Sequence, residues 1–236
     1  MSYIGIKREN DRFYKQNVFP EMVSDAIDEL PEPSEAARKS AYSIDENTEN
    51  ITTIGAILRY AADKRVAALN FANAMYAGGG YVLGGNAQEE SLCRASMLYY
   101  TIKTCKKYYR KNRLHILPDY TDMMIWSENV PVIRDENGEM LEDQLKCDFI
   151  TCPAVNRTFA KFIMPGGKIK KTMRRRIKRI ITLAVMKKPD VLILGAFGCG
   201  IFGNRRKDVF PMFEEMINKY VPDDIQVIFA VPDSGR

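Results

Sequence analysis

A glycine-rich stretch leads into a short run of polar residues whose types could do chemistry. Its glycines are Gly78, Gly79, Gly80, Gly84 and Gly85, and the polar run is Gln88, Glu89 and Glu90. Glycine lacks a Cβ and tolerates positive φ, so backbone amides in such a stretch can approach a ligand closely and point inward. The pattern predicts an anion-binding loop that ends beside two carboxyl groups.

The same residues also allow simpler interpretations. Glycines alone are typical of a tight turn, and acids at the start of a helix are favoured by the helix dipole. The stretch fits neither GxGxxG nor GxxxxGK[ST], because no lysine follows the glycines. Without GxGxxG and its downstream acid, an NAD-dependent dehydrogenase is disfavoured.

Two strand–loop–helix units must position these groups. The first is an apolar strand at 65–71, the glycine-rich loop and a helix at 89–109. The second is a strand at 191–194, a loop at 195–204 and a helix from about Lys207 to Tyr220. Alternating strands and helices indicate a largely parallel or mixed sheet covered on both faces. Because both loops follow strands, both can line one cleft, which suits a dinucleotide-like ligand.

The glycine triplet, seven further residues and Gln-Glu-Glu resemble the signature of the poly(ADP-ribose) glycohydrolase family. The surrounding Asn73, Ala87 and residues 91–94 resemble its compact microbial branch, which is built on a macrodomain. The resemblance extends with gaps from about Ile51 to Val231. It implies a three-layer α/β/α fold with a central mixed, largely parallel sheet.

The 236 residues are enough for one sizeable domain. We expect residues 1–236 to form a single macrodomain-type domain, with residues 1–50 as a helical N-terminal extension packed on it.

The resemblance also implies a ligand and residue roles. ADP-ribose is the implied core ligand, and the implied activity is its release from poly(ADP-ribose). Glu90 matches the catalytic acid, and Glu89 matches the acid that orients the distal ribose. The implied substrate-binding residues are Asn73, Gly78, Gly79, Gly80 and Gln88 in the first unit and Gly198, Cys199, Gly200, Ile201 and Phe202 in the second. Within this set, Asn73 matches a donor to a ribose hydroxyl and Phe202 an aromatic beside the distal ribose.

Elementary chemistry is consistent with these roles. Cleaving an O-glycosidic bond requires a proton on the leaving oxygen and stabilisation of an oxocarbenium-like centre. Glu90 could supply that proton and then activate the incoming water. A usual glycosidase places two separate carboxylates across the bond, whereas adjacent Glu89 and Glu90 point differently. We therefore do not assign them as an acid and base pair.

Two other functions use the same pocket. One is a binding module that recognises or sequesters ADP-ribose without cleaving it, although both acids argue against a pure reader. The other is hydrolysis of a mono-ADP-ribosyl linkage on protein or nucleic acid. The expected partners are poly(ADP-ribose) or ADP-ribosylated macromolecules, with ADP-ribose as product.

Composition excludes several classes of protein. The net charge of +5 would favour anionic ligands, but it does not predict direct nucleic-acid binding. Five cysteines form no CxxC pair and there is one histidine, so we expect neither a metal site nor a cofactor. No apolar leader and no run of 18 apolar residues is present, so we expect a cytoplasmic or other reducing intracellular location and no membrane association.

The remaining expectations concern elements around the site. We expect a short helix at 35–41, a helix from Thr52 or Thr53 to Ala62, strands at 113–117, 123–133 and 146–152, and a turn at Asn137-Gly138. The helix at 168–188 is rich in cations, which either form a solvated face or attract a polyanion. His115 is expected to be structural, and Cys199 to pack rather than act as a nucleophile. Phe229 and residues 231–233 are candidates for contact with adenine.

Overall fold

The computed structural model describes residues 2–36 and 38–233. Its centre is a seven-stranded sheet in the order β1-β4-β5-β3-β6-β7-β2. The strands are β1 (Val23–Ile27), β2 (Thr48–Glu49), β3 (Val66–Phe71), β4 (Met124–Arg134), β5 (Met140–Cys152), β6 (Val191–Leu194) and β7 (Gln226–Ala230). From β5 to β2 the neighbours are parallel, while β1, β4 and β5 are antiparallel. The predicted mixed, largely parallel sheet is confirmed.

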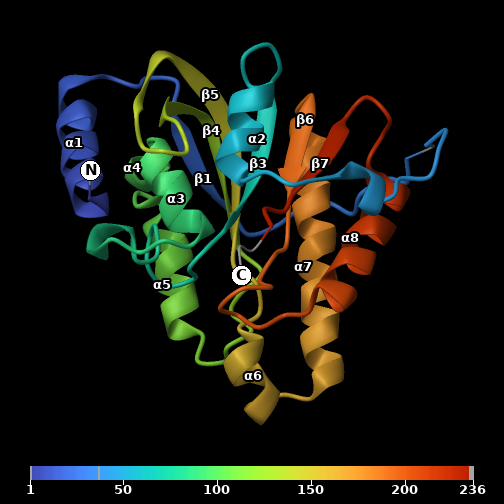
Figure 1. Ribbon diagram of the computed structural model, residues 1–236. Helices are drawn as coiled ribbons and strands as arrows, with labels where there is room; N and C mark the ends of the chain where they lie inside the picture. The colour runs from blue at the N-terminus through green and yellow to red at the C-terminus, as the bar shows by residue number, and fades with distance from the viewer. Residues whose placement is uncertain (1, 37, 234–236) are drawn as a thin grey trace.

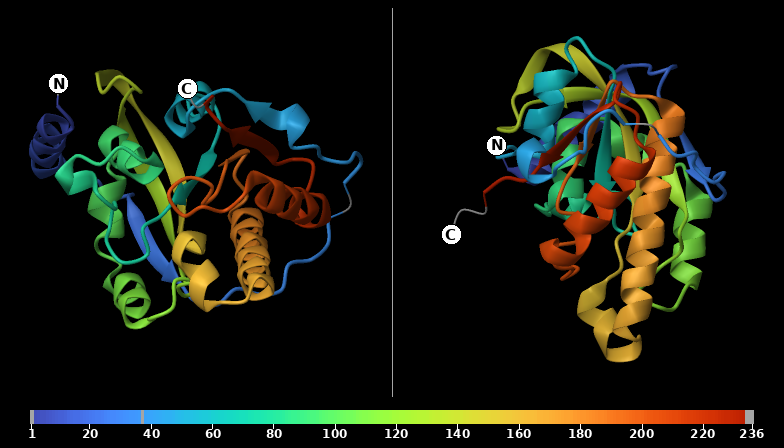
Figure 2. Two further views of the ribbon diagram at one scale, coloured as in Figure 1. Left: turned by 60° about the horizontal axis from the view of Figure 1, so that its bottom comes forward. Right: turned by 90° about the vertical axis from the view of Figure 1, so that its right-hand side faces the viewer.

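Helices cover both faces of this sheet (Figure 1). They are α1 (Tyr3–Gln16), α2 (Thr53–Tyr60), α3 (Gln88–Ala95), α4 (Leu98–Ile102), α5 (Lys106–Leu114), α6 (Arg157–Ile163), α7 (Gly166–Lys187) and α8 (Arg206–Tyr220), with short 3-10 turns at Asp45–Asn47 and Tyr81–Leu83. Figure 2 shows α3, α4 and α5 on one side of the sheet and α7 and α8 on the other. This is the predicted three-layer α/β/α arrangement.

The central strands are apolar on both faces because both faces are covered. In β3, Val66 and Ala68 pack into the core under α2 to α5, whereas Ala67 and Leu69 pack into the core under α7 and α8. All four side chains are buried. The continuous apolar run in the sequence therefore reports a strand enclosed between two helical layers.

The first 50 residues are only partly helical. Helix α1 packs near α3, but β1 pairs antiparallel with β4 at one edge of the sheet and β2 pairs parallel with β7 at the other. The short helix expected at 35–41 is not formed by described residues 35, 36 and 38–41. Backbone groups there instead bond the end of α8 and the turn after it: Ala36 N donates to Lys219 O at 2.9 Å, and Lys39 N donates to Asp223 Oδ2 at 2.9 Å.

The helix expected at 89–109 is divided into α3, α4 and the start of α5. Helix α3 ends at Ala95, and Ser96 caps it: its Oγ donates to Leu92 O at 2.7 Å and accepts the Leu98 N–H at 3.2 Å. The next amide, Met97 N, donates to Pro131 O of β4 at 2.9 Å. A contact with the sheet thus interrupts a sequence whose apolar spacing is otherwise helical.

Helix α7 confirms the cation-rich helix but not an open basic face. Arg176 is fully buried, and its guanidinium donates to Pro153 O and Asp119 O. Several exposed cations pair with acids from other elements, including Arg174 with Glu215. Most of the helix is therefore an amphipathic packing element, and its N-terminal end adjoins a cavity.

Within the described parts of the chain, no helix combines the length and apolarity needed to span a bilayer.

Candidate active site

The two glycine-rich loops lie side by side because the strands before them are neighbours. Strands β3 and β6 are parallel and in register, with Ala67 opposite Leu192, so both end at the same edge of the sheet. A cleft of about 860 Å³ opens between the loops. Its lining includes these residues singled out from the sequence: Asn73, Gln88, Glu89, Glu90, Gly198, Cys199, Gly200, Ile201 and Phe202.

Glu90 joins the glycine loop to its own helix. Its Oε1 accepts the Gly80 N–H at 2.7 Å, and its Oε2 accepts the Ala87 N–H at 3.0 Å. The second bond is the helix-capping role expected of an acid at this position. Each carboxylate oxygen can accept a further hydrogen bond, and Glu90 is half-buried in the cleft wall, so one side remains available to a ligand.

Glu89 occupies a different environment. It is 3% exposed, its Oε2 accepts the Asn73 N–H at 2.7 Å, and its Oε1 faces the Asn70 amide at 3.4 Å. Burial raises the pKa of Glu89 to about 8, because the charged form loses its hydration. Glu89 is therefore largely protonated near neutral pH, and its hydroxyl can donate a hydrogen bond.

Asn70 is a polar residue of the site that the sequence analysis missed. It lies fully buried on β3, where its Nδ2 donates to Thr151 Oγ1 at 3.1 Å and faces Glu89. Its Oδ1 has no partner among the described residues. The sequence does contain a signal for this role, an asparagine inside an otherwise apolar strand, because a buried side-chain amide needs hydrogen-bond partners.

The glycine triplet supports the two acids rather than lining the cleft. A Cβ on Gly79 would lie 2.5 Å from Glu90 Oε1 and 3.2 Å from Glu89 Oε2. Gly79 also has φ +55°, and Gly78 before it has φ +69°, both in the region that favours glycine. The loop thus approaches both carboxyl groups as closely as backbone atoms allow.

The amides of Gln88 and Asn73 hold the ends of the first loop. Gln88 Oε1 accepts Phe71 N–H at 2.9 Å, and its Nε2 donates to Leu69 O at 2.8 Å and Thr53 Oγ1 at 3.2 Å. Asn73 Oδ1 accepts the amides of Met75 and Tyr76. Gln88 therefore fastens α3 to the end of β3, while Asn73 Nδ2 is left as a donor at the cleft.

The second loop is closed by Asn204. Its Nδ2 donates to Val155 O at 2.8 Å and to Gly198 O at 3.1 Å. Gly198 has φ +70°, and a Cβ there would lie 2.4 Å from Ala154 Cβ. Gly200 differs, because a Cβ would meet nothing within 4 Å and its φ is ordinary. The tight turn requires Gly198, whereas Gly200 only leaves space at the cleft.

Cys199 and His115 do not form a nucleophile and base. Burial raises the pKa of the Cys199 thiol to about 11, which keeps it protonated. His115 ends α5 rather than lying in the expected strand, and its Nε2 lies 2.8 Å from Asp119 Oδ1. His115 is not among the described residues that line the cleft.

The cleft extends beyond the residues found from sequence. Thr52 and Thr53 at the start of α2 line it, as do Tyr3 of α1 and the turn at 135–138. Of the adenine candidates, Val231 and Pro232 line the cleft, but Phe229 is fully buried and packs its ring against Phe210 and Phe213. The suggestion of Phe229 as an adenine contact is therefore wrong.

The protonation of Glu89 should be visible as a pH dependence of stability. A carboxyl whose pKa is raised from 4.5 to about 8 holds its proton more tightly in the folded than in the unfolded chain. Its contribution is full below about pH 4.5 and is lost as the pH rises toward 8, at up to about 1.4 kcal/mol per pH unit. Glu89→Gln should therefore flatten the decline in unfolding free energy between pH 5 and 8, measured by urea denaturation. Equal slopes for the variant and the unmodified chain would contradict a buried, protonated Glu89.

Across residues 2–36 and 38–233, no group of three or more His, Cys, Asp or Glu side chains is arranged to hold a metal ion.

The fold is that of a macrodomain-like α/β protein. The carboxyl groups of Glu89 and Glu90 line its cleft, and such groups can act as the proton donor of a hydrolase. The family model described as microbial-type PARG, catalytic domain, matches residues 4–135, more than half of the chain. The chain belongs to this family, the microbial-type poly(ADP-ribose) glycohydrolases, and is an enzyme of that type.

Solved structures agree with this assignment. Poly(ADP-ribose) glycohydrolase from Thermomonospora curvata, bound to the inhibitor ADP-HPD, is 34% identical over 80% of this chain and 74% of its own, with a TM-score of 0.75. The enzyme from Deinococcus radiodurans in complex with ADP-ribose is also 34% identical, over 80% of this chain and 77% of its own, with a TM-score of 0.75. The comparison with curated proteins gave no significant match.

Proposed function

We propose that this enzyme hydrolyses the ribose–ribose O-glycosidic bonds of poly(ADP-ribose) and releases ADP-ribose. One observation carries the proposal: the carboxyl groups of Glu89 and Glu90 meet the glycine triplet at one wall of a cleft whose other wall is a second glycine-rich loop. The first wall supplies carboxyl groups that can donate a proton, and the second supplies a loop that suits a diphosphate. Family membership and the ADP-ribose complex of the similar Deinococcus enzyme support the same ligand.

In this proposal the diphosphate lies along residues 198–202. Gly200 leaves room for phosphate oxygens, and backbone amides of such a loop are suitable donors. Phe202 is half-buried at the cleft and packs beside the distal ribose. Asn73 Nδ2 donates to a ribose hydroxyl from the opposite wall.

Glu90 is the proposed acid. Its half-exposed carboxyl protonates the leaving oxygen, and the resulting carboxylate then accepts a proton from the attacking water. The substrate diphosphate helps to hold that water and offsets positive charge at the ribose. The backbone bonds from Gly80 and Ala87 fix the position of Glu90 during both steps.

Glu89 is the proposed positioning acid. Only 3% of it is exposed, so it reaches the ligand over a small area, and Asn73 N–H and Asn70 hold its two oxygens. In the protonated form it donates to one ribose hydroxyl. Gln88 supports the site indirectly, because its side-chain amide holds the end of β3 against α3.

A reader without catalysis and a mono-ADP-ribosyl hydrolase would use the same cleft. The half-exposed Glu90 favours an enzyme over a reader. The proposed partners are therefore poly(ADP-ribose) or ADP-ribosylated macromolecules. We also infer a reducing, cytoplasm-like compartment from the five free thiols, four of them buried.

Ligand binding gives a direct test of the cleft. Millimolar ADP-ribose should raise the melting temperature and bind in a 1:1 complex by calorimetry, because a ligand that binds only the folded chain stabilises it. Turnover should require no nicotinamide cofactor and should survive EDTA. An absence of both heat and thermal shift would refute the ligand, and full loss of activity in EDTA would refute metal independence.

Gly200→Val should abolish detectable ADP-ribose binding while leaving the fold intact. A Cβ at Gly200 meets nothing within 4 Å, so the variant has no internal clash. The branched side chain instead occupies space at the cleft that phosphate oxygens need. Circular dichroism and the melting temperature establish folding, and Gly200→Ala gives a smaller side chain for comparison. Normal calorimetric affinity of a folded Gly200→Val would show that the diphosphate lies elsewhere.

A further inference from the structure

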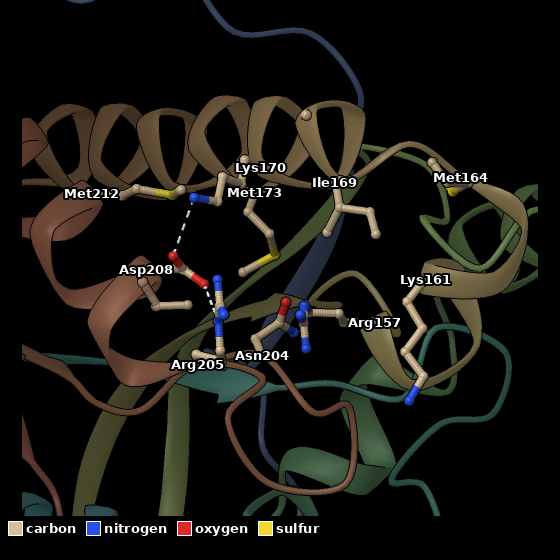
Figure 3. Close-up of a pocket in the computed structure, with 13 residues that line it drawn as sticks. Arg157, Lys161, Met164, Ile169, Lys170, Met173, Asn204, Arg205, Asp208 and Met212 are labelled. Carbon is tan, nitrogen blue, oxygen red and sulfur yellow. Dashed lines mark hydrogen bonds and ion pairs between the residues drawn. The ribbon is translucent and has the colours of Figure 1, made fainter.

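A second cavity, of about 340 Å³, lies next to the glycine-rich loop at 195–204 and outside the cleft. It is enclosed by α6, the first turns of α7 and the start of α8. Figure 3 shows Ile169 and Met173 of α7 pointing toward Asn204 and Arg157. None of the chemistry described above uses this cavity.

The charged lining of the cavity is strongly cationic. The lining contains four cationic residues, Arg157, Lys161, Lys170 and Arg205, and one carboxylate, Asp208. Asp208 bonds Arg205 Nε at 2.6 Å and Lys170 Nζ at 3.3 Å (Figure 3). The net charge of the lining is therefore positive even after this pairing, as an anionic ligand requires.

The floor of the cavity is apolar. Ile169, Met173, Val209 and Met164 are buried, and Met212 adds a fifth apolar side chain. Methionine and isoleucine surfaces suit a flat heterocycle, and methionine adapts its shape. An apolar floor with a cationic rim is complementary to an adenine nucleotide, whose base is apolar on its faces and whose phosphates are anionic.

Two glycines form part of the cavity lining. Gly166 and Gly167 begin α7 and line the cavity, yet a Cβ on either would meet nothing within 4 Å, and neither has positive φ. Glycine in a helix costs about 1 kcal/mol relative to alanine. Neither backbone conformation nor packing requires glycine here, and a side chain at either position would add bulk to the lining.

The cavity and the reacting end of the cleft share one loop. Thr158 N donates to Phe202 O at 3.1 Å and its Oγ1 to Ile201 O at 3.0 Å, while Arg157 Nη1 donates to Gly203 O at 3.2 Å. The start of α6 is thus fastened to the back of the loop whose front holds Phe202. Ile201, between these bonded positions, lines the cleft and is exposed.

We propose that this cavity binds the adenosine and phosphate of the polymer unit on the leaving side of the cleaved bond. The inference rests on the proposed function. In poly(ADP-ribose) the distal ribose of one unit is bonded to the adenosine ribose of the next, so an adenine nucleotide is the group nearest the departing oxygen. A mono-ADP-ribosylated protein has no such nucleotide. The cavity therefore selects polymer over mono-ADP-ribosyl linkages to amino-acid side chains.

Two variants test the cavity without touching the cleft. Gly167→Phe adds a bulky side chain to its lining, and Gly167→Ala controls for the loss of glycine. Lys161→Glu reverses a cation on its rim, and Lys171→Glu makes the same charge change on an exposed α7 position outside the lining. Gly167→Phe and Lys161→Glu should each lower kcat/KM on poly(ADP-ribose) by about tenfold or more, the scale of a lost charge-assisted contact. Calorimetric affinity for free ADP-ribose should stay within about twofold, since ADP-ribose fills only the cleft.

Polymer binding measured in the Glu90→Gln background repeats the comparison without turnover, so the cavity is tested even if the enzyme assignment fails. Both variants should again bind polymer about tenfold more weakly than their controls. Equal polymer affinity and turnover in Gly167→Phe, Gly167→Ala and the unmodified chain would overturn the cavity proposal alone. Weakened binding of single-stranded DNA with unchanged polymer turnover would also overturn it, in favour of a nucleic-acid site. Failure of the unmodified chain to bind ADP-ribose would instead refute the cleft assignment.

Discussion

Glu90→Gln should slow release of ADP-ribose from poly(ADP-ribose) by on the order of 100-fold or more, the usual scale for losing proton transfer. Glutamine keeps the shape and can still accept the Gly80 N–H through its oxygen. Its amide nitrogen cannot accept the Ala87 N–H, so a cost in stability of about 1 kcal/mol accompanies the change. Affinity for ADP-ribose should change far less, because the proposed diphosphate contacts lie on the other loop.

Initial rates on labelled polymer and calorimetry with ADP-ribose separate these effects. Glu136→Gln is the matched control, because Glu136 lines the same cleft but contacts Thr52 rather than the glycine loop. Glu89→Gln should weaken binding as well as rate, because in the proposed role Glu89 holds ribose hydroxyls in the ground state too. Cleavage at the unmodified rate by Glu90→Gln would show that another group donates the proton.

Gly79→Ala should also cost about 100-fold in turnover, although it changes no chemical group. The added methyl would lie 2.5 Å from Glu90 Oε1, so the carboxyl must move from its place against the loop. Positive φ adds a backbone cost of about 1–2 kcal/mol to the folded state.

Gly84→Ala distinguishes displacement of Glu90 from simple destabilisation. Gly84 has φ +81°, but a Cβ there meets Ile4 at 3.5 Å and no carboxyl group. Its melting temperature should fall by a similar amount while turnover stays near normal when both are measured below the transition. If the two alanine variants lose activity equally, loop stability rather than carboxyl position explains the loss.

Sequence patterns predicted the elements that carry the site. The apolar runs before both glycine loops are β3 and β6, and their parallel pairing brings the loops together. Parallel strands inside a covered sheet are apolar throughout, which makes them easy to recognise. The positions of Glu89, Glu90 and the loop at 198–202 along one cleft follow from those two units.

Features that depend on distant contacts were not predictable in the same way. The two-residue β2 is a strand only because β7 lies beside it, and α3 ends where Met97 bonds Pro131 of β4. The support of Glu89 by Asn70 likewise depends on how α3 docks on β3. The spacing of residues along the chain carries no information on such contacts. The different environments of the adjacent Glu89 and Glu90 therefore became apparent only in the folded structure.

Product analysis on two labelled substrates tests the central claim most directly. The unmodified chain is incubated with poly(ADP-ribose) and, separately, with mono-ADP-ribosylated protein, and the products are resolved by chromatography. We predict release of ADP-ribose from the polymer, lost in Glu90→Gln and retained in Glu136→Gln. A chain that binds ADP-ribose but releases nothing from either substrate would contradict the account and leave a reader of ADP-ribose in its place.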